Sequence, residues 1–344
     1  MVEKHLQETE MIGRLMTQTN TDYISGLQHQ LNEVIASTCR GMTSYALVDF
    51  PDHSNVGDSA IYLGELKLLR EILQRDPAFV SKAKNHVDDI NKFGAVNAVF
   101  LHGGGNFGDV WPAHQQFRER IIARYPDHKI VQLPQTLFFK DPAALKRSAE
   151  VIARHPNFTL LVRDQRSYNI AYDAFDCEVK LCPDSAMSLG ALPKVGTVTH
   201  PRLAMLRQDK ETQLEAGDIL KMAGDCPVED WVEEERFKPI HEVLLDKVMP
   251  ILGPLRWKTM PTLSVQYESW ASTRVNRGLA QLSTADFIVT DRLHVHILSS
   301  LLGIEHVVLD NNYGKISEYI KQWGKPDNAI VVSSVEELKT LLPA

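Results

Sequence analysis

The feature that most constrains this chain is an alternation of short apolar runs with longer amphipathic segments. The runs are rich in β-branched and aromatic residues, as strands buried on both faces are, and the segments between them repeat apolar residues at helical spacing. Strands that alternate with helices in this way are typical of a parallel sheet with helices on its faces. The sequence therefore predicts an α/β protein built on doubly wound sheets.

The alternation divides the chain into two parts. In the first part, strands are expected at residues 45–50, 95–103, 129–136, 158–164 and 178–184, with helices at 4–40, after the loop 51–60, and at 114–124, 143–155 and 165–175. In the second part, strands are expected at 199–209, 287–289, 306–309 and 329–334, with helices at 269–285, after Asp291, at 315–323 and at the end of the chain. We predict two Rossmann-like domains, 1–190 and 191–344, with the last helix packing back on the first domain. Residues 210–268 give no regular pattern.

Composition limits the class of protein. An apolar fraction of 44% and a charged fraction of 24% are ordinary for a globular chain, and the net charge of −7 argues against a nucleic-acid partner. The sequence contains no run of about 18 apolar residues, so no transmembrane helix is expected. The first residues carry acidic side chains and no apolar stretch, so no secretory signal is expected. The four cysteines have no zinc-type spacing. We therefore expect a cytoplasmic protein with reduced thiols and no metal ion.

Residues 287–312 predict a strand, a tight loop, a helix and a second strand. Asp291 occupies the expected N-cap position, and Arg292, His294 and His296 open the helix. Ligands of such folds bind outside the carboxyl ends of strands, where a helix N-terminus favours anions. An arginine and a histidine there predict a site for an anionic substrate whose reaction moves a proton.

A glycine-rich loop follows the expected strand at 95–103. Its sequence at 102–108, HGGGNFG, matches the G-x-G-x-x-G pattern of dinucleotide-binding folds, but Trp111-Pro112 interrupts the helix that should follow. It also resembles the oxyanion loop of esterases, but the chain has no G-x-S-x-G elbow. Two interpretations stay open: close approach of backbone N–H groups to a ligand, or a tight turn alone. The candidate contacts are His102, Gly103, Gly104, Gly105 and Asn106.

Two further loops carry polar residues at expected strand ends. Asn55 and Asp58 suit a helix cap, which explains them structurally, and Asp58 could also hold a sugar hydroxyl. Arg163 lies at the end of the expected strand at 158–164. Because a helix N-terminus disfavours cations, its placement predicts an anionic partner.

Six of these segments, in this order, resemble the polysaccharide pyruvyl transferase family. They are NVGDSAI (55–61), HGGGNFGD (102–109), LPQT (133–136), VRDQRS (162–167), CPDSA (182–186) and TDRLHVHIL (290–298). The resemblance implies a GT-B-like fold with the active site in the crevice between the domains. It also implies transfer of pyruvate from phosphoenolpyruvate to a sugar as a cyclic ketal, without a cofactor. The expected contacts to phosphoenolpyruvate are Arg163, Arg292, Leu293, His294 and Lys315.

The chemistry of this reaction assigns roles to three of these residues. Planar guanidinium groups suit both the carboxylate and the phosphate of phosphoenolpyruvate, so Arg163 and Arg292 are expected to bind it. His294 is expected to protonate the methylene carbon. His296 lies two positions further along the helix, about 200° around it, and is expected to pack against the sheet instead.

Two other functions fit the same fold. One is a GT-B glycosyltransferase that uses a nucleotide sugar, and the other is a non-catalytic component that binds glycan.

For a pyruvyl transferase we expect a glycan acceptor, in the form of a lipid-linked oligosaccharide. The enzyme would then contact the inner face of the membrane peripherally, and a homo-oligomer stays open.

Overall fold

The computed structural model describes residues 17–86, 88, 90, 96–207, 226–231, 257–310 and 314–341. The chain divides into two compact units. The large unit comprises Gln30–Leu189 and Trp231–Gly278, and the small unit comprises Met1–His29, Gly190–Asp230 and Leu279–Ala344. The predicted domains 1–190 and 191–344 differ from these units at the first 29 residues and at residues 231–278. The start of the helix expected at 4–40 and most of the irregular segment 210–268 lie outside the described residues.

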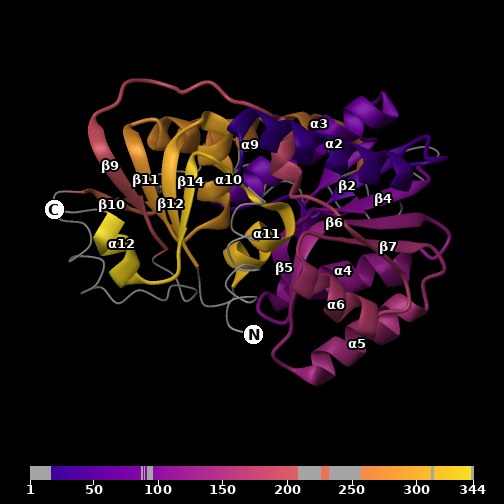
Figure 1. Ribbon diagram of the computed structural model, residues 1–344. Helices are drawn as coiled ribbons and strands as arrows, with labels where there is room; N and C mark the ends of the chain where they lie inside the picture. The colour runs from indigo at the N-terminus through magenta and orange to yellow at the C-terminus, as the bar shows by residue number, and fades with distance from the viewer. Residues whose placement is uncertain are drawn as a thin grey trace, which may run out of the picture. The chain divides into compact units, whose positions relative to one another are not determined.

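The large unit is built on a parallel sheet in the order β3-β2-β4-β6-β7-β8, with β5 pairing with β6 (Figure 1). Its strands are β2 (Tyr45–Val48), β3 (Phe79–Ser81), β4 (Ala98–Leu101), β5 (Gly104–Gly108), β6 (Lys129–Phe138), β7 (Phe158–Val162) and β8 (Glu178–Leu181). Strands β2 and β4 are buried along their whole length, because helices cover the sheet on both faces. This layered packing explains why the apolar runs of the sequence do not alternate with polar residues.

The helices of the large unit lie on both sides of its sheet. They are α3 (Val56–Leu73), α4 (Pro112–Arg124), α5 (Pro142–Ala153), α6 (Gln165–Ala174) and the short 3₁₀ helices η1 (Ala83–Asn85) and η3 (Ser185–Leu189). Figure 1 shows α4, α5 and α6 on one side of this sheet and α3 on the other. The unit is therefore doubly wound, as predicted.

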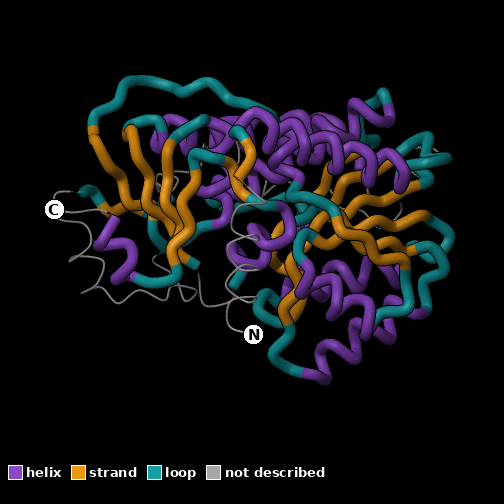
Figure 2. Tube along the Cα trace, in the orientation of Figure 1, coloured by secondary structure: helices purple, strands orange, loops and turns teal. Residues whose placement is uncertain are grey.

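The small unit has a five-stranded parallel sheet in the order β10-β9-β11-β12-β14, which Figure 2 shows in orange. Its strands are β9 (His200–Met205), β10 (Val228–Glu229), β11 (Ala285–Thr290), β12 (Glu305–Leu309) and β14 (Ala329–Val332). Its helices are α10 (Leu293–Leu302), α11 (Lys315–Trp323) and α12 (Val335–Leu341), and β1 (Thr17–Gln18) pairs with β13 (Lys325–Pro326). The apolar core of the sheet includes Ala204, Val289, Val307 and Val332.

In each sheet, the order in which the chain adds strands reverses once. The place where it reverses, the switch point, positions the candidate sites. In the large unit, the chain moves from β2 outward to β3 and then returns to β4 on the other side of β2. In the small unit, it moves from β9 to β10 and returns to β11 on the other side of β9. Open parallel sheets bind ligands at such switch points, outside the carboxyl ends of the two diverging strands. Residues that follow β2 and β4, and those that follow β9 and β11, are therefore the first candidates.

Helices α2 (Asn20–Thr38) and α9 (Met260–Leu282) each contain residues of both units. α9 begins nine residues earlier than the helix predicted at 269–285. Among the helices that the structure describes, none combines the length and apolar character needed to cross a bilayer.

The predicted strand–helix alternation is confirmed, with three local corrections. Strand β3 was not predicted, because three residues are too few to show a period. Gly104–Gly108 forms strand β5 rather than an open loop. Arg292, not Asp291, is the N-cap residue of α10, and its side chain makes no capping bond. The Asp291 Oδ1 instead accepts a hydrogen bond from the backbone N–H of Arg207, at 2.9 Å.

Candidate functional site

Asp49 directly follows β2 at the switch point of the large unit. It is 3% exposed, and its φ of 70° lies in the left-handed region that non-glycine residues rarely adopt. Its carboxylate lies 2.9 Å from Nδ1 of His114, which stands in the first turn of α4. A strained backbone that aims a buried carboxylate at an imidazole is typical of a functional position rather than of a packing role.

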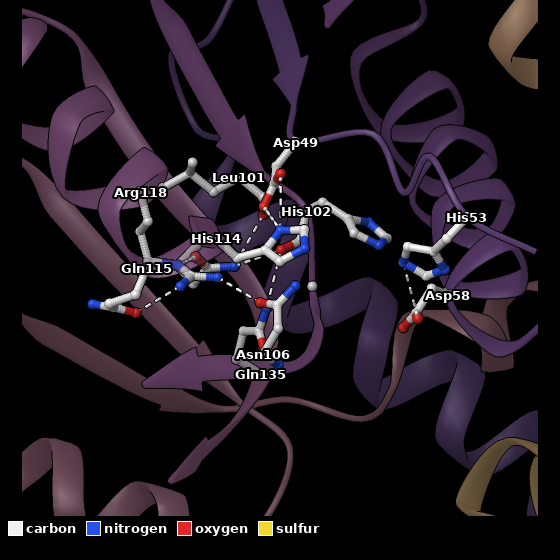
Figure 3. A network of polar contacts seen from close by, with 12 residues as sticks. Asp49, His53, Asp58, Leu101, His102, Asn106, His114, Gln115, Arg118 and Gln135 are labelled. Carbon is white, nitrogen blue, oxygen red and sulfur yellow. Dashed lines mark hydrogen bonds and ion pairs between the residues drawn. The ribbon is translucent and has the colours of Figure 1, made fainter. Parts of the chain in front are cut away.

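His102 follows β4 on the other side of the switch point. Its Nδ1 lies 2.7 Å from Oε2 of Glu65, a buried residue of α3, and Oε1 of Glu65 accepts the Gly103 N–H at 2.7 Å. In the view of Figure 3, the His102 ring lies between the Asp49–His114 pair and the His53–Asp58 pair. His53 Nε2 is 3.5 Å from Asp58 Oδ2.

Arg118 is a fully buried cation that organises the amides around this point (Figure 3). Its Nε donates to Gln132 at 2.5 Å, its Nη1 to Gln115 at 2.7 Å and its Nη2 to the Asn106 Oδ1 at 2.7 Å. Because a guanidinium can only donate, the amide oxygens must face it. The Asn106 oxygen also accepts from Gln135, so the two bonds fix which side of this amide is the acceptor and which is the NH₂ donor. Burial lowers the pKa of Arg118 to about 10, against the charges of Asp49 and Glu119, so it stays charged at neutral pH.

The backbone of the glycine-rich segment makes several contacts inside the large unit. Three of its backbone N–H groups are used inside the unit: Gly103 donates to Glu65, Asn106 to Gln135 and Gly108 to Gln115. Gly103 must be glycine here, since a Cβ would lie 2.7 Å from the Pro134 carbonyl oxygen and 2.9 Å from Oε1 of Glu65. At Gly103, the groups that approach the backbone closely belong to the protein itself.

Gly104 and Asn55 also have structural explanations. Gly104 has a φ of 117° and begins β5. Asn55 is the N-cap residue of α3, and its side chain accepts the Gly57 N–H at 2.8 Å. Gly105 follows Gly104 in β5. A contact of any of them with an acceptor stays a prediction.

Arg163 leaves β7 as predicted, but it already has an internal partner. It is 2% exposed, its Nη1 lies 2.5 Å from Asp184 Oδ2, and its Nε donates to the Thr136 hydroxyl at 2.8 Å. Asp184 follows β8 and is itself buried. This buried ion pair joins the ends of two strands. Arg163 belongs to the large unit and Arg292 to the small unit, so their common contact with one substrate stays a prediction, as does the site between two domains.

Arg292 follows β11 at the switch point of the small unit. It is 8% exposed, and its guanidinium forms an ion pair with Asp230, which follows β10. Its Nε is buried and has no hydrogen-bond partner among the described residues. The backbone N–H of Arg292 donates to the Thr290 hydroxyl at 3.0 Å, which fixes the loop. One arginine donor is thus paired internally, and Nε has no acceptor in the part of the chain that the structure describes.

The two histidines of α10 differ in their surroundings. His294 is half-buried in the first turn, next to Leu293, the first residue of the helix. His296 is fully buried, and its Nδ1 lies 2.8 Å from Nε2 of His306 in β12. His296 therefore packs against the sheet, as predicted. Lys315 is the first residue of α11, and its side chain lies outside the described part of the structure.

Four residues of this constellation were not predicted from the sequence: Asp49, Glu65, His114 and Arg118. A usable signal existed for two of them. Asp49 ends an apolar run, which places a carboxylate at a strand's carboxyl end. Glu65 lies seven residues after Asp58, so both share one face of the helix with apolar residues such as Ile61 and Leu69. His114 and Arg118 stand four apart on α4, and nothing in the sequence singles them out.

The two switch points differ in the chemistry that they can support. The large unit offers carboxylates, imidazoles and a fixed amide donor, which suit the hydroxyls of a sugar. The small unit offers a guanidinium and a helix N-terminus, which suit an anion. Among the described residues, no group of three or more histidines, cysteines or carboxylates could hold a metal ion.

Comparison with known proteins assigns the family. The family model described as polysaccharide pyruvyl transferase matches residues 55–313. Pyruvyl transferase 1 of Schizosaccharomyces pombe is 33% identical over 88% of this chain and 76% of its own. EpsO of Bacillus subtilis, provisionally named a pyruvyl transferase, is 30% identical over 82% of this chain and 87% of its own. The crystal structure of a functionally uncharacterized Klebsiella pneumoniae protein shares the fold, with a TM-score of 0.57 at 15% identity over 90% of this chain and 99% of that one. This chain belongs to the polysaccharide pyruvyl transferase family.

Proposed function

We propose that this protein transfers the pyruvyl unit of phosphoenolpyruvate onto two hydroxyls of a sugar, forming a cyclic ketal and releasing phosphate. The observation that carries the proposal is the difference between the two switch points in a chain of this family. In the small unit, the buried Nε of Arg292 has no acceptor among the described residues, at a helix N-terminus where the anionic donor substrate would bind. Asp49, His102 and Asn106 in the large unit suit a polyhydroxylated acceptor.

The proposed reaction needs few protein groups. His294 donates a proton to the methylene carbon, which leaves an oxocarbenium-like centre at C2. One acceptor hydroxyl attacks C2, phosphate departs with stabilisation by Arg292, and the second hydroxyl closes the ring. The two hydroxyl protons balance the one added to carbon and the one carried away by phosphate. The scheme requires neither a metal ion nor a cofactor.

The proposal extends to the acceptor and its place in the cell. Phosphoenolpyruvate is a cytosolic metabolite, so we propose that the enzyme works in the cytoplasm. An acceptor that is a lipid-linked oligosaccharide would be presented at the inner face of the membrane, where the enzyme would bind peripherally. Fractionation of cells and flotation of the protein with acceptor-bearing vesicles would test this. A protein found only in a secreted fraction would contradict it.

A ligand panel tests the donor. A ligand that binds only the native state raises the melting temperature, by an amount that grows with its concentration above Kd. Phosphoenolpyruvate should raise the melting temperature of the wild-type protein and not that of the Arg292→Ala variant. UDP and GDP should have no effect. A shift with UDP or GDP and none with phosphoenolpyruvate would favour a GT-B glycosyltransferase instead.

A further inference from the structure

The buried Glu65 carboxylate holds His102 in one orientation. Glu65 is 1% exposed and His102 is 2% exposed. One carboxylate oxygen accepts the Gly103 N–H and the other lies 2.7 Å from Nδ1 of His102. An ionised carboxylate can only accept, so Nδ1 must carry the proton of a neutral imidazole. The lone pair of that imidazole is then on Nε2.

Nε2 of His102 is buried and has no hydrogen-bond partner among the described residues. The other buried histidines of the large unit behave differently. His86 lies 2.9 Å from the Ser81 hydroxyl and 2.7 Å from that of Tyr125, one contact for each ring nitrogen. His155 likewise contacts the Tyr125 carbonyl with Nε2 and the Asn157 N–H with Nδ1. His86 and His155 thus use both ring nitrogens. Nδ1 of His128 and Nε2 of His296 are, like Nε2 of His102, buried without a partner among the described residues. His102 differs from these two in that a buried carboxylate holds its other nitrogen at the switch point of the sheet.

The charges around His102 favour proton uptake. Burial alone lowers the pKa of the imidazole, but Glu65, through its charge and its hydrogen bond, and the charges of Asp58 and Asp49 outweigh burial and raise it. Burial also raises the pKa of the Glu65 carboxyl, against the opposing influence of His102 and the Gly103 N–H, and Asp184 raises it further. The groups that face the pair are therefore carboxylates from α3 and from the ends of β2 and β8. Together they make the Glu65–His102 pair a stronger base than a histidine in water.

We infer that His102 is the base that takes the proton of the acceptor hydroxyl that attacks C2, and that Glu65 is its positioning residue. The inference rests on the proposed function and adds a proton acceptor to it. The hydroxyl O–H bond breaks as the O–C2 bond forms, and the proton passes to Nε2. His102 then passes this proton to the departing phosphate, which leaves as hydrogenphosphate. The proton of the second hydroxyl restores the group that protonated the methylene carbon.

Glu65→Gln tests the inference through the imidazole tautomer. The glutamine oxygen can still accept the Gly103 N–H, but its NH₂ then faces Nδ1 of His102 as a donor. The neutral imidazole must move its proton to Nε2 and loses the lone pair that acts as base. We expect kcat to fall by roughly 10²- to 10⁴-fold in Glu65→Gln and in His102→Ala. The shift of melting temperature caused by phosphoenolpyruvate should remain in both variants.

Two readouts separate this role from a structural one. In wild type, kcat/KM for the acceptor should rise with pH through a pKa above the ordinary value of histidine. Nitrogen NMR should show Nδ1–H as the neutral tautomer of His102, and Glu65→Gln should lower the pKa and reverse the tautomer. The control His86→Gln removes a buried histidine whose nitrogens are both used. It should lower the melting temperature and leave the shape of the pH profile unchanged.

The outcomes are distinguishable. An active wild type whose rate and pH profile survive Glu65→Gln would overturn the inference and leave the proposed function intact. An Nε2–H tautomer in the neutral wild-type imidazole would overturn it as well. A wild-type protein that releases no phosphate from phosphoenolpyruvate with any acceptor would overturn the proposed function, and with it the proton transfer to His102.

Discussion

The two units of this protein share a sheet topology but differ in the charges at their switch points. In the large unit, the diverging strands β2 and β4 end in Asp49 and His102, surrounded by further carboxylates, imidazoles and amides. In the small unit, Arg207 and Arg292 follow β9 and β11, where Asp291 accepts the Arg207 N–H and Asp230 pairs with Arg292. One topology thus supports two candidate sites with different side chains, because the fold sets the position of a site and the side chains set its ligand. We interpret the difference as a division between acceptor binding and donor binding.

Of the changes that compare donor binding with acceptor binding, the one at the small-unit switch point should have the largest effect. Arg292→Lys keeps the positive charge but loses the planar fork, and we expect kcat/KM for phosphoenolpyruvate to fall by roughly 10²- to 10³-fold. Steady-state kinetics at varied concentrations of phosphoenolpyruvate would measure this fall in kcat/KM. Lys321→Ala, on an exposed face of α11 in the same unit, is the control and should stay close to wild type. A normal KM for phosphoenolpyruvate in Arg292→Lys would break the assignment of the donor to this unit.

The matching change in the large unit should act on the acceptor. Asn tolerates the left-handed backbone, so Asp49→Asn should keep the local conformation while it removes the charge. A hydrogen bond to a charged group contributes about 1.5–3 kcal/mol, so kcat/KM for the acceptor should fall by roughly 10- to 100-fold. The KM for phosphoenolpyruvate should not change. If Asp49→Asn impaired the donor as much as the acceptor, the two sites would not be separate in function.

The units should also differ in acid stability. Burial lowers the pKa of His296 well below its usual value and that of His306 to about 4, so both are neutral in the folded small unit. Below the ordinary histidine pKa of about 6.5, the unfolded state binds more protons, so folding stability falls with pH down to the folded pKa. For His306 alone, the loss between pH 7 and pH 5 is about 2 kcal/mol.

Hydrogen exchange at several pH values would measure this loss locally. Protection of α10 and β12 should decrease on acidification before that of β4 and β6. The variant His306→Asn should make protection of α10 less dependent on pH. Equal loss of protection in both units would contradict the assignment of acid sensitivity to the buried histidine pair.

The smallest effect concerns Asn55, which the sequence leaves as either a cap or an acceptor contact. Asn55→Ala should destabilise the protein by about 1 kcal/mol through loss of the α3 cap, as urea unfolding would measure. Asn55→Asp restores a cap oxygen and should restore stability. If Asn55→Asp were stable but had a raised KM for the acceptor, the amide group itself would contact the acceptor.

Much of the fold could be predicted from the sequence because buried parallel strands leave a strong local signal. Strands such as Tyr45–Val48 and helices such as Lys315–Trp323 are visible in the apolar pattern alone. Strand β5 could not be predicted in this way, since its glycines favour a loop and only pairing with β6 makes them a strand. The N-cap of α10 was misplaced because Asp291 bonds to Arg207, a residue far away in the sequence.

The candidate site was predictable only where chemistry coincides with a strand end. Arg292, His294 and His102 meet that condition. Glu65 does not, because its role depends on the approach of α3 to the Gly103 backbone, which is a tertiary contact. Arg163 shows the converse: its strand-end position suggested an external anion, and the folded chain supplies an internal partner, Asp184, that the sequence did not reveal. Local sequence thus locates polar groups well but does not show whether their partners lie inside the protein.

The most direct test of the account is to follow phosphoenolpyruvate labelled with carbon-13 at C2 in the presence of the enzyme and a panel of methyl hexopyranosides or lipid-linked oligosaccharides. We expect the label to move from the enol carbon to a quaternary ketal carbon bonded to two sugar oxygens, with one phosphate released for each ketal. The Arg292→Lys and Asp49→Asn variants should slow the same conversion. Phosphate release without a ketal signal, or transfer of a sugar from UDP- or GDP-linked donors under the same conditions, would contradict it.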